Sequence, residues 1–455
     1  MKDMTVGNEG KLIFYFALPM LFGNVFQQMY NVVDSVIVGN YIGKNALAAV
    51  GASFPVIFVL ISLIVGISSG STIIISQYFG AKDYKKVKAT MDTMFIFLFF
   101  ASLTITALGL LFSRNIFEMM DLPKEILPEA IIYFNIFISG AVLLFGYNGV
   151  SAALRGMGDS KTPLYFLIIS TILNIILVML FVVVFHWGIA GTAVATVIAQ
   201  GVAFLISVIY LNKYHTIIKF SIKDFTFDKE IFIKSIKIGI PSGLQQTFVA
   251  IGMMALIRIV NGFGTDAIAA YSVAGRIDSF AIMPAMNFSM ALSSFVGQNI
   301  GANKTERVKK GFRATMLMTG AVAIFITIFA VIFGETIMGL FTNDQNVIKI
   351  GESYLVIVSS FYIVFSFMFV VGGVLRGAGD TLIPMFITLL SLWLLRVPLS
   401  WWFSRSYGTD GIWWGIPIAW IFGFVMSYAY YLTGRWKRKA IIKRPVVQIE
   451  EPLVE

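Results

Sequence analysis

The sequence predicts an all-α integral membrane protein with twelve transmembrane helices, arranged as two pseudo-symmetric halves of six. Three observations lead to this fold class. Of the 455 residues, 58% are hydrophobic and only 13% are charged, whereas a soluble domain has about 25% charged residues. Twelve apolar runs are long enough to cross a bilayer, for which a helix needs about 20 residues. Finally, a set of short motifs occurs twice at one constant spacing, which indicates an internal repeat.

The predicted spans follow one another along the chain with short polar connections. They cover residues 12–39, 47–77, 88–112, 129–153, 162–185, 188–211, 232–261, 267–298, 312–333, 350–374, 381–404 and 411–433. Several are longer than the minimum, which indicates tilted helices or helices that extend beyond the lipid. Because the number of spans is even, both ends of the chain are predicted to lie on the same side of the membrane.

The basic residues predict which side that is. Of the 34 Lys and Arg residues, 26 fall in segments on the side of the termini, five on the opposite side and three within spans. Basic residues gather on the cytoplasmic side of membrane proteins, so we expect a multi-pass protein of the cell (inner) membrane with both termini in the cytoplasm. The same distribution accounts for the net charge of +10 without a nucleic-acid partner.

The internal repeat divides the chain into two lobes. The motif LRGMGD at 154–159 recurs as LRGAGD at 375–380, and QYFGA at 77–81 recurs as QNIGA at 298–302, both at a spacing of 221 residues. Each repeat has an even number of spans, so the two halves enter the membrane the same way round, with a cavity expected between them. We expect a first lobe at 1–211, a charged cytoplasmic linker at 212–230, a second lobe at 231–434 and a cytoplasmic tail at 435–455.

A polar stripe interrupts the first span. At about 100° per residue, Gln27, Tyr30, Asn31 and Asp34 fall on one face of the helix. An aspartate in lipid costs about 2.5–3.5 kcal/mol, so Asp34 must face protein or water. We interpret it as part of a transport pathway. The alternative is a structural aspartate that hydrogen-bonds to a neighbouring helix.

Composition excludes several other functions. The chain has no cysteine and two isolated histidines, His186 and His215, so neither metal chemistry nor a nucleophile–base pair is indicated, and we expect no enzyme and no cofactor. Nothing resembles the repeated selectivity filter of a channel. A flippase for lipid-linked or polyanionic precursors remains the alternative function. It would need a strongly cationic cavity, and only Arg258, Arg276 and Arg396 lie within spans.

Several motifs together resemble one family. LRGMGDSKTP and LRGAGDTLIP in matching loops, YNVVDSVIVG followed by ALAAVG, and QYFGAK after the second span resemble the multidrug and toxic compound extrusion (MATE) transporters, in particular the DinF-like branch. The resemblance extends over essentially the whole chain. It implies two six-helix lobes in a V shape that export lipophilic or cationic small molecules, drugs or toxins, in exchange for protons or sodium ions. We expect a monomer in contact with membrane lipids.

The resemblance also implies a coupling site in the first lobe. By position, it is formed by Asp34, Tyr133, Asn148, Asn174 and Thr196. The family often has an aspartate four residues after the asparagine of the fifth helix, where this chain has Val178. One carboxylate is therefore missing, and proton coupling through Asp34 is favoured. A sodium ion at Asp34, Asn174 and Thr196 remains open, as does a purely structural hydrogen bond between Asn174 and Thr196.

The second lobe gives weaker signals. The acids that part of the family carries in the seventh and tenth helices are absent, apart from Glu352 near the end of the tenth. Asp278 in the eighth span is either a second coupling site or half of a buried ion pair with Arg258 or Arg396. As polar residues of the substrate cavity we expect Gln27, Tyr30, Asn31, Gln245, Gln246, Tyr271, Asp278 and Asn287.

Overall fold

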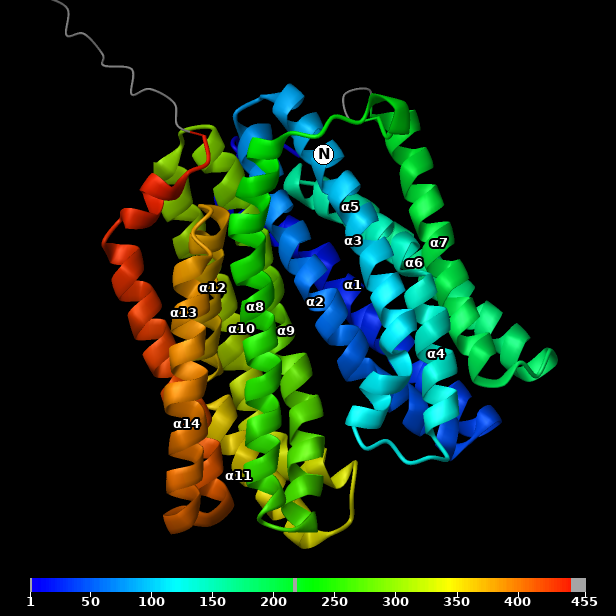
Figure 1. Ribbon diagram of the computed structural model, residues 1–455. Helices are drawn as coiled ribbons and strands as arrows, with labels where there is room; N and C mark the ends of the chain where they lie inside the picture. Colours follow the sequence, from blue (N-terminus) through cyan, green and yellow to red (C-terminus); the bar gives the residue numbers. More distant parts are fainter. Residues whose placement is uncertain (1, 216–218, 443–455) are drawn as a thin grey trace, which may run out of the picture.

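The computed structural model describes residues 2–215 and 219–442, and every regular element in them is a helix (Figure 1). The first half of the chain contains α1 (Glu9–Ile37), η1 (Val38–Ile42), α2 (Lys44–Gly80), α3 (Tyr84–Met119), α4 (Leu127–Ser139), α5 (Ala141–Gly156), α6 (Lys161–Val178), η2 (Met179–Val184) and α7 (Gly188–Tyr214). After η3 (Ile222–Asp224), the second half contains α8 (Lys229–Asn261), α9 (Thr265–Gly301), α10 (Thr305–Gly339), α11 (Gln345–Ser359), α12 (Tyr362–Gly377), α13 (Leu382–Leu389), η4 (Leu390–Arg396), α14 (Val397–Leu432) and η5 (Arg435–Lys439).

The helices confirm an all-helical protein with many membrane spans. Among the described residues, nine helices are long and apolar enough to cross a bilayer, and two bent pairs bring the number to 11. The run Leu382–Leu432 has 51 residues and would be about 75 Å long if straight, more than twice the bilayer core. Its backbone breaks at Gly408, with φ 60° and ψ −138°. Counting the two sides of that break separately gives the twelve spans that the sequence predicts.

Two predicted spans are broken rather than continuous. α4 and α5 meet at a 50° bend, and α11 and α12 meet at 47°. The bends fall at Gly140 and at Ser360–Phe361, so they are one repeat length apart. At Gly140 a Cβ atom would lie 2.5 Å from the Val197 side chain of α7. A glycine therefore lets the chain turn directly against a neighbouring helix, which hydropathy alone does not reveal.

The two halves approach each other most closely on the side of the chain termini, which we call the termini side. A Cβ atom on Gly66 of α2 would lie 2.6 Å from Gly243 of α8, and one on Gly70 would lie 2.6 Å from the Ser235 carbonyl oxygen. Such small residues allow helix backbones to pack against each other in membranes. At Gly51, nearer the other end of α2, nothing lies within 4 Å of the same position. Accordingly, the ribbons of α2 and α8 diverge away from the termini side (Figure 1).

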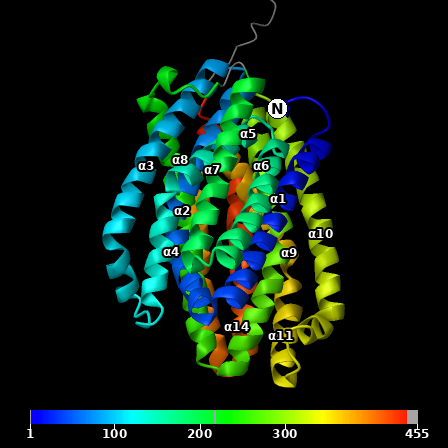
Figure 2. The same cartoon turned by 90° about the vertical axis from the view of Figure 1, so that its right-hand side faces the viewer.

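Helix α1 connects the two halves. It packs against α6 in the first half and against α9 and α10 in the second (Figure 2). Near its middle, the Asn24 side-chain amide donates a hydrogen bond of 3.0 Å to Asn287 Oδ1 on α9. Pro19, inside the helix, removes one backbone donor and so weakens the helix locally. The two faces of α1 therefore belong to different halves, which places its polar stripe beside the line where the halves meet.

Candidate coupling and substrate site

Asp34 lies near the end of α1, immediately before the π-helical turn η1. With 1.5 Å per residue, it is about 12 Å from Ile42 at the far end of this span, so it lies within the membrane-spanning part. The residue is only 9% exposed. Its Oδ1 atom is buried and has no hydrogen-bond partner among the described residues. A charged oxygen in that position is strongly disfavoured unless a proton or a cation accompanies it.

A hydrogen-bonded cluster of three helices lies beside this carboxylate. Tyr30, one turn before Asp34, has its hydroxyl 3.1 Å from Thr196 Oγ1 of α7. The Asn174 side-chain amide of α6 donates to the same Thr196 oxygen over 3.2 Å. Thr196 in turn donates to the Thr192 carbonyl oxygen over 3.1 Å. The geometry thus contains the inter-helix hydrogen bond between Asn174 and Thr196 that the sequence left open.

The two residues of the fourth span behave differently. Tyr133 is 7% exposed, and Tyr30 and Asp34 lie within electrostatic range of its hydroxyl. The Asn148 side-chain amide instead donates over 2.8 Å to the Leu144 carbonyl oxygen of its own helix. Four of the five residues implied by the resemblance therefore gather around the Tyr30–Asp34 face, whereas Asn148 is satisfied elsewhere.

Val178 occupies the position where the family often has a second aspartate, and its surroundings are apolar. Val178 is fully buried and packs in an apolar cluster with Ile37 and Phe181. Among the described residues, no group of three or more His, Cys, Asp or Glu side chains could hold a metal ion. A cation beside Asp34 would therefore rely on neutral oxygens such as the Thr196 hydroxyl, which already accepts hydrogen bonds.

Of the other predicted cavity residues, some are exposed and others form hydrogen bonds with neighbouring helices. Gln27, Asn31 and Gln246 are exposed. The Gln245 side-chain amide donates over 2.7 Å to Thr388 Oγ1 on α13. Asn287 is 1% exposed and, through its bond with Asn24, joins the halves in this conformation rather than lining an open space.

Asp278 is held by tyrosines. The hydroxyl of Tyr362 on α12 donates to its carboxylate over 2.6 Å, and that of Tyr354 on α11 over 3.3 Å. Arg396 is buried and close enough to interact electrostatically, but no ion pair joins Asp278 to an arginine within the described ranges 2–215 and 219–442. Tyr271, a predicted cavity residue, stacks on Trp413 at 5.6 Å beside this group.

Sequence reasoning missed the partnership of these tyrosines with Asp278. One signal was available, because Tyr354 lies one repeat length after Tyr133. Each half thus has a buried tyrosine of its fourth span near a carboxylate. The carboxylates themselves, Asp34 and Asp278, are on non-equivalent helices, so the repeat alone could not pair Tyr354 with Asp278.

Two surface grooves lie within single halves. One of about 370 Å³ is between α4 and α7, at Asn135, Ser139 and Val197. The other, of about 560 Å³, is between α8 and α14, at Arg258 and Trp401. Neither groove includes Asp34 or Asp278 in its lining.

Comparisons with known proteins agree with the repeat and the fold. The family model MatE matches the chain twice, at residues 19–180 and 241–402. The probable multidrug resistance protein YpnP of Bacillus subtilis is 34% identical over 435 residues, which cover 96% of this chain and 97% of that protein. The probable multidrug resistance protein NorM of Thermotoga maritima is 27% identical and covers 95% of this chain and 94% of its own.

A solved structure shows the same architecture. It is described as the outward-facing conformation of a multidrug resistance MATE family transporter of the MOP superfamily. It superimposes with a TM-score of 0.89 over 96% of this chain and 99% of that one, at 24% sequence identity. The duplicated match of the family model and the relatives over nearly the full length lead to one conclusion: the chain belongs to the MATE family of multi-pass membrane transporters and is not an enzyme.

Proposed function

We propose that this protein exports lipophilic, cationic small molecules in exchange for protons by alternating access, with Asp34 as the coupling carboxylate. One observation carries the proposal. Asp34 Oδ1 is buried in a spanning helix without a hydrogen-bond partner among the described residues. Two relatives are named as probable multidrug resistance proteins, which supports drug-like molecules as the substrate class.

The physical chemistry of the site links the proton to the substrate. Burial favours the neutral acid, whereas water or a nearby positive charge favours the carboxylate. A cation that enters the space beside α1 therefore favours the ionised form and displaces the proton. When the halves open to the other side and the cation leaves, a proton returns. The cluster of Tyr30, Asn174 and Thr196 holds the helices around Asp34 during this exchange.

A sodium ion is the second candidate for the coupling ion. Hard cations prefer oxygen ligands, and Asp34 and Thr196 provide them beside α1. With Val178 in place of a second carboxylate, the site has one formal negative charge, which fits a proton better than a tightly held Na⁺. Within the family, we assign the chain to the DinF-like branch on its loop motifs and on the absence of an acid from residues 232–261, the part of α8 that follows Glu230.

Efflux from proteoliposomes tests the proposal. The purified protein would be reconstituted, and the movement of a fluorescent lipophilic cation would be followed with a proton gradient or a sodium gradient imposed separately. We expect transport with the proton gradient alone. Asp34→Asn keeps the shape of the side chain but cannot release a proton, so gradient-driven transport should fall to the level of empty liposomes.

Asp121→Asn is the matched control, because it removes one carboxylate from an exposed position after α3. It should transport as the unaltered protein does. Undiminished transport by Asp34→Asn would remove Asp34 from the mechanism. Transport driven only by the sodium gradient would replace the proton by Na⁺.

A further inference from the structure

Two buried glutamines connect the halves on the termini side. Gln77 lies in the last turn of α2 and Gln298 in the last turn of α9, and both are 0% exposed. The side-chain amide of Gln77 donates to the Gly377 carbonyl oxygen of the second half, and that of Gln298 donates to the Gly156 carbonyl oxygen of the first, each over 3.1 Å. The two contacts are related by the repeat spacing, and they cross between the halves in opposite directions.

The two end segments of the chain donate hydrogen bonds to the side-chain oxygens of both glutamines. The backbone N–H of Met4 donates to Gln298 Oε1, and that of Ile441 donates to Gln77 Oε1, each over 2.9 Å. In each end segment, the carbonyl group two residues before this N–H donor packs against a glycine of a loop. A Cβ atom on Gly158 would lie 2.2 Å from the Lys2 oxygen, and one on Gly379 would lie 3.3 Å from the Lys439 oxygen. The two chain ends thus run in the same sense over equivalent loops.

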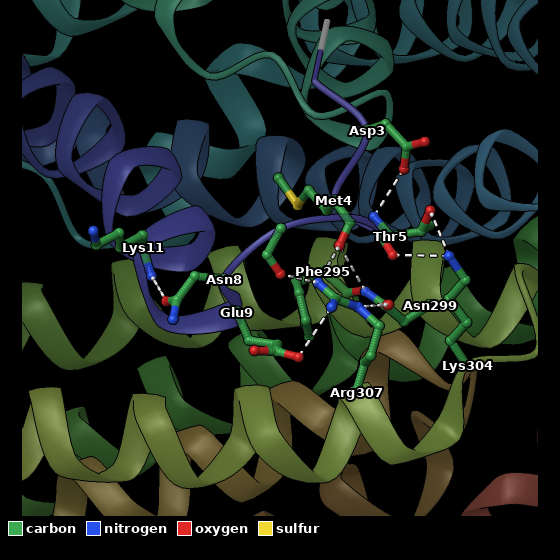
Figure 3. A network of polar contacts seen from close by, with 11 residues as sticks. Asp3, Met4, Thr5, Asn8, Glu9, Lys11, Phe295, Asn299, Lys304 and Arg307 are labelled. Carbon is green, nitrogen blue, oxygen red and sulfur yellow. Dashed lines mark hydrogen bonds and ion pairs between the residues drawn. The ribbon is translucent and has the colours of Figure 1, made fainter.

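Each chain end has its own attachment. The N-terminal segment is held by side chains of α9, of α10 and of the turn between them (Figure 3). The Asn299 amide donates to the Met4 carbonyl oxygen over 3.2 Å, and the Lys304 ammonium donates to the Thr5 carbonyl oxygen over 2.9 Å. Arg307 donates to the Gly7 carbonyl oxygen over 2.8 Å and forms an ion pair with the Glu9 carboxylate at 3.0 Å. The C-terminal segment is held by Trp436, which is 1% exposed, stacks on the Tyr431 ring at 5.5 Å and donates to the Tyr431 carbonyl oxygen over 3.0 Å.

This arrangement makes closure of the termini side cooperative. Each glutamine is fully buried and uses both its amide and its oxygen. If the halves separate, the amide loses its partner across the interface. If a chain end leaves, the oxygen loses its donor while it is still buried, which disfavours the closed form. Opening the interface and releasing the chain ends therefore favour each other.

We propose that Gln77 and Gln298 are the gate residues of the termini side, and that each is kept closed by one end of the chain. This inference rests on the proposed alternating-access function, in which the termini side must open once in every cycle. By donating hydrogen bonds to the two glutamines, the end segments stabilise the conformation in which the termini side is closed.

A cysteine reporter tests the gate. The chain contains no cysteine, so a single Ser71→Cys substitution places the only thiol between α2 and α8. Ser71 is 1% exposed, 3.4 Å from the Ser235 hydroxyl. In nanodiscs both faces are accessible, and the rate of maleimide labelling reports opening of the termini side. Ile441→Pro removes one N–H donor, and Ala440 before it already has the extended ψ of 132° that a following proline requires.

We expect Ile441→Pro to accelerate labelling of Ser71→Cys roughly fivefold, the effect of one lost hydrogen bond on a two-state equilibrium. Gln77→Leu and Gln298→Leu should also accelerate labelling of Ser71→Cys, and the two variants should have effects of similar size. Ile442→Pro is the matched control, because it retains the Ile441 donor, and it should leave the rate unchanged.

A second reporter distinguishes a gate from general loosening. Gln27→Cys lies on the exposed face of α1, one turn beyond the Asn24–Asn287 contact. If the termini side opens as the other side closes, labelling at Gln27→Cys should slow in the same variants. Faster labelling at both reporters, or an unchanged rate at Ser71→Cys, would overturn the proposal. If labelling becomes faster at Ser71→Cys and slower at Gln27→Cys, but the protein transports no cation, the proposed function is rejected and the gate is retained. If transport depends on Asp34 but the two labelling rates do not change in opposite directions, the gate alone is rejected.

Discussion

At the scale of single residues, Asp34 and Asp278 show how surroundings separate two carboxylates of the same type. Asp34 has a buried oxygen with no hydrogen-bond partner among the described residues, whereas Asp278 accepts hydrogen bonds from two tyrosines and has Arg396 nearby. The first arrangement leaves a place for a mobile proton. The second compensates a negative charge permanently and ties α9 to α11 and α12.

Tyr362→Phe tests the structural role of the Asp278 group. The substitution removes a donor 2.6 Å from a buried carboxylate, so it should lower the free energy of unfolding by about 1–3 kcal/mol. Thermal unfolding in detergent measures the change. Tyr428→Phe is the control, because Tyr428 is 36% exposed and no hydrogen bond of its hydroxyl is recorded within the described residues. If both variants unfold at the temperature of the unaltered protein, the tyrosine does not stabilise this group.

At the scale of helices, the glycines of α2 determine how the halves meet. Gly66 and Gly70 bring α2 into backbone contact with α8, and Gly80 has Gln298 of α9 against it. Each glycine lacks the side chain that would hold the helices apart. The termini side is therefore closed by main-chain packing, onto which the two glutamines add directional hydrogen bonds.

Gly66→Ala and Gly51→Ala form a matched pair on this helix. Alanine is a better helix former than glycine by about 0.8–1.0 kcal/mol, so Gly51→Ala, with nothing within 4 Å, should be neutral or stabilising. Gly66→Ala places a methyl group 2.6 Å from the Gly243 backbone and should lower both the unfolding temperature and the transport rate. Equal behaviour of the two variants would show that α2 and α8 have room to separate without loss of function.

Much of the helical framework could be predicted, because hydropathy and the repeat depend on many residues at once. The spans and the duplicated motifs follow from the sequence, and the proximity of Asn174 to Thr196 follows from the resemblance, whereas the hydrogen bond of Tyr30 to Thr196 was not predicted. The bends at Gly140 and Ser360–Phe361 could not be predicted, since they depend on contacts with a neighbouring helix. The pairing of Asp278 with Tyr354 and Tyr362, and the docking of the chain ends on Gln77 and Gln298, join segments far apart in sequence and leave no local pattern.

At the scale of the whole molecule, the predicted orientation follows from the distribution of basic residues and is open to a direct test. Lys11, on the termini side, and Lys124, on the opposite side, are both exposed. In the cysteine-free chain, Lys124→Cys should react with a membrane-impermeant thiol reagent in intact cells. Lys11→Cys should react only after the membrane is permeabilised. The reverse pattern would place the termini outside the cell.

The crossed glutamine contacts give this end of the molecule an approximate two-fold symmetry. Each contact occurs twice, once in each direction between the halves, as at the interface of a two-fold symmetric dimer. By the repeat spacing, Lys86 corresponds to Arg307, and each pairs with a carboxylate at the start of a helix: Lys86 with Asp228 before α8 and Arg307 with Glu9 in α1, both over 3.0 Å, although the counterpart of Glu9 is Glu230. The N-terminal segment reaches Gln298 and the C-terminal segment reaches Gln77, so two segments from opposite parts of the polypeptide occupy symmetry-related places.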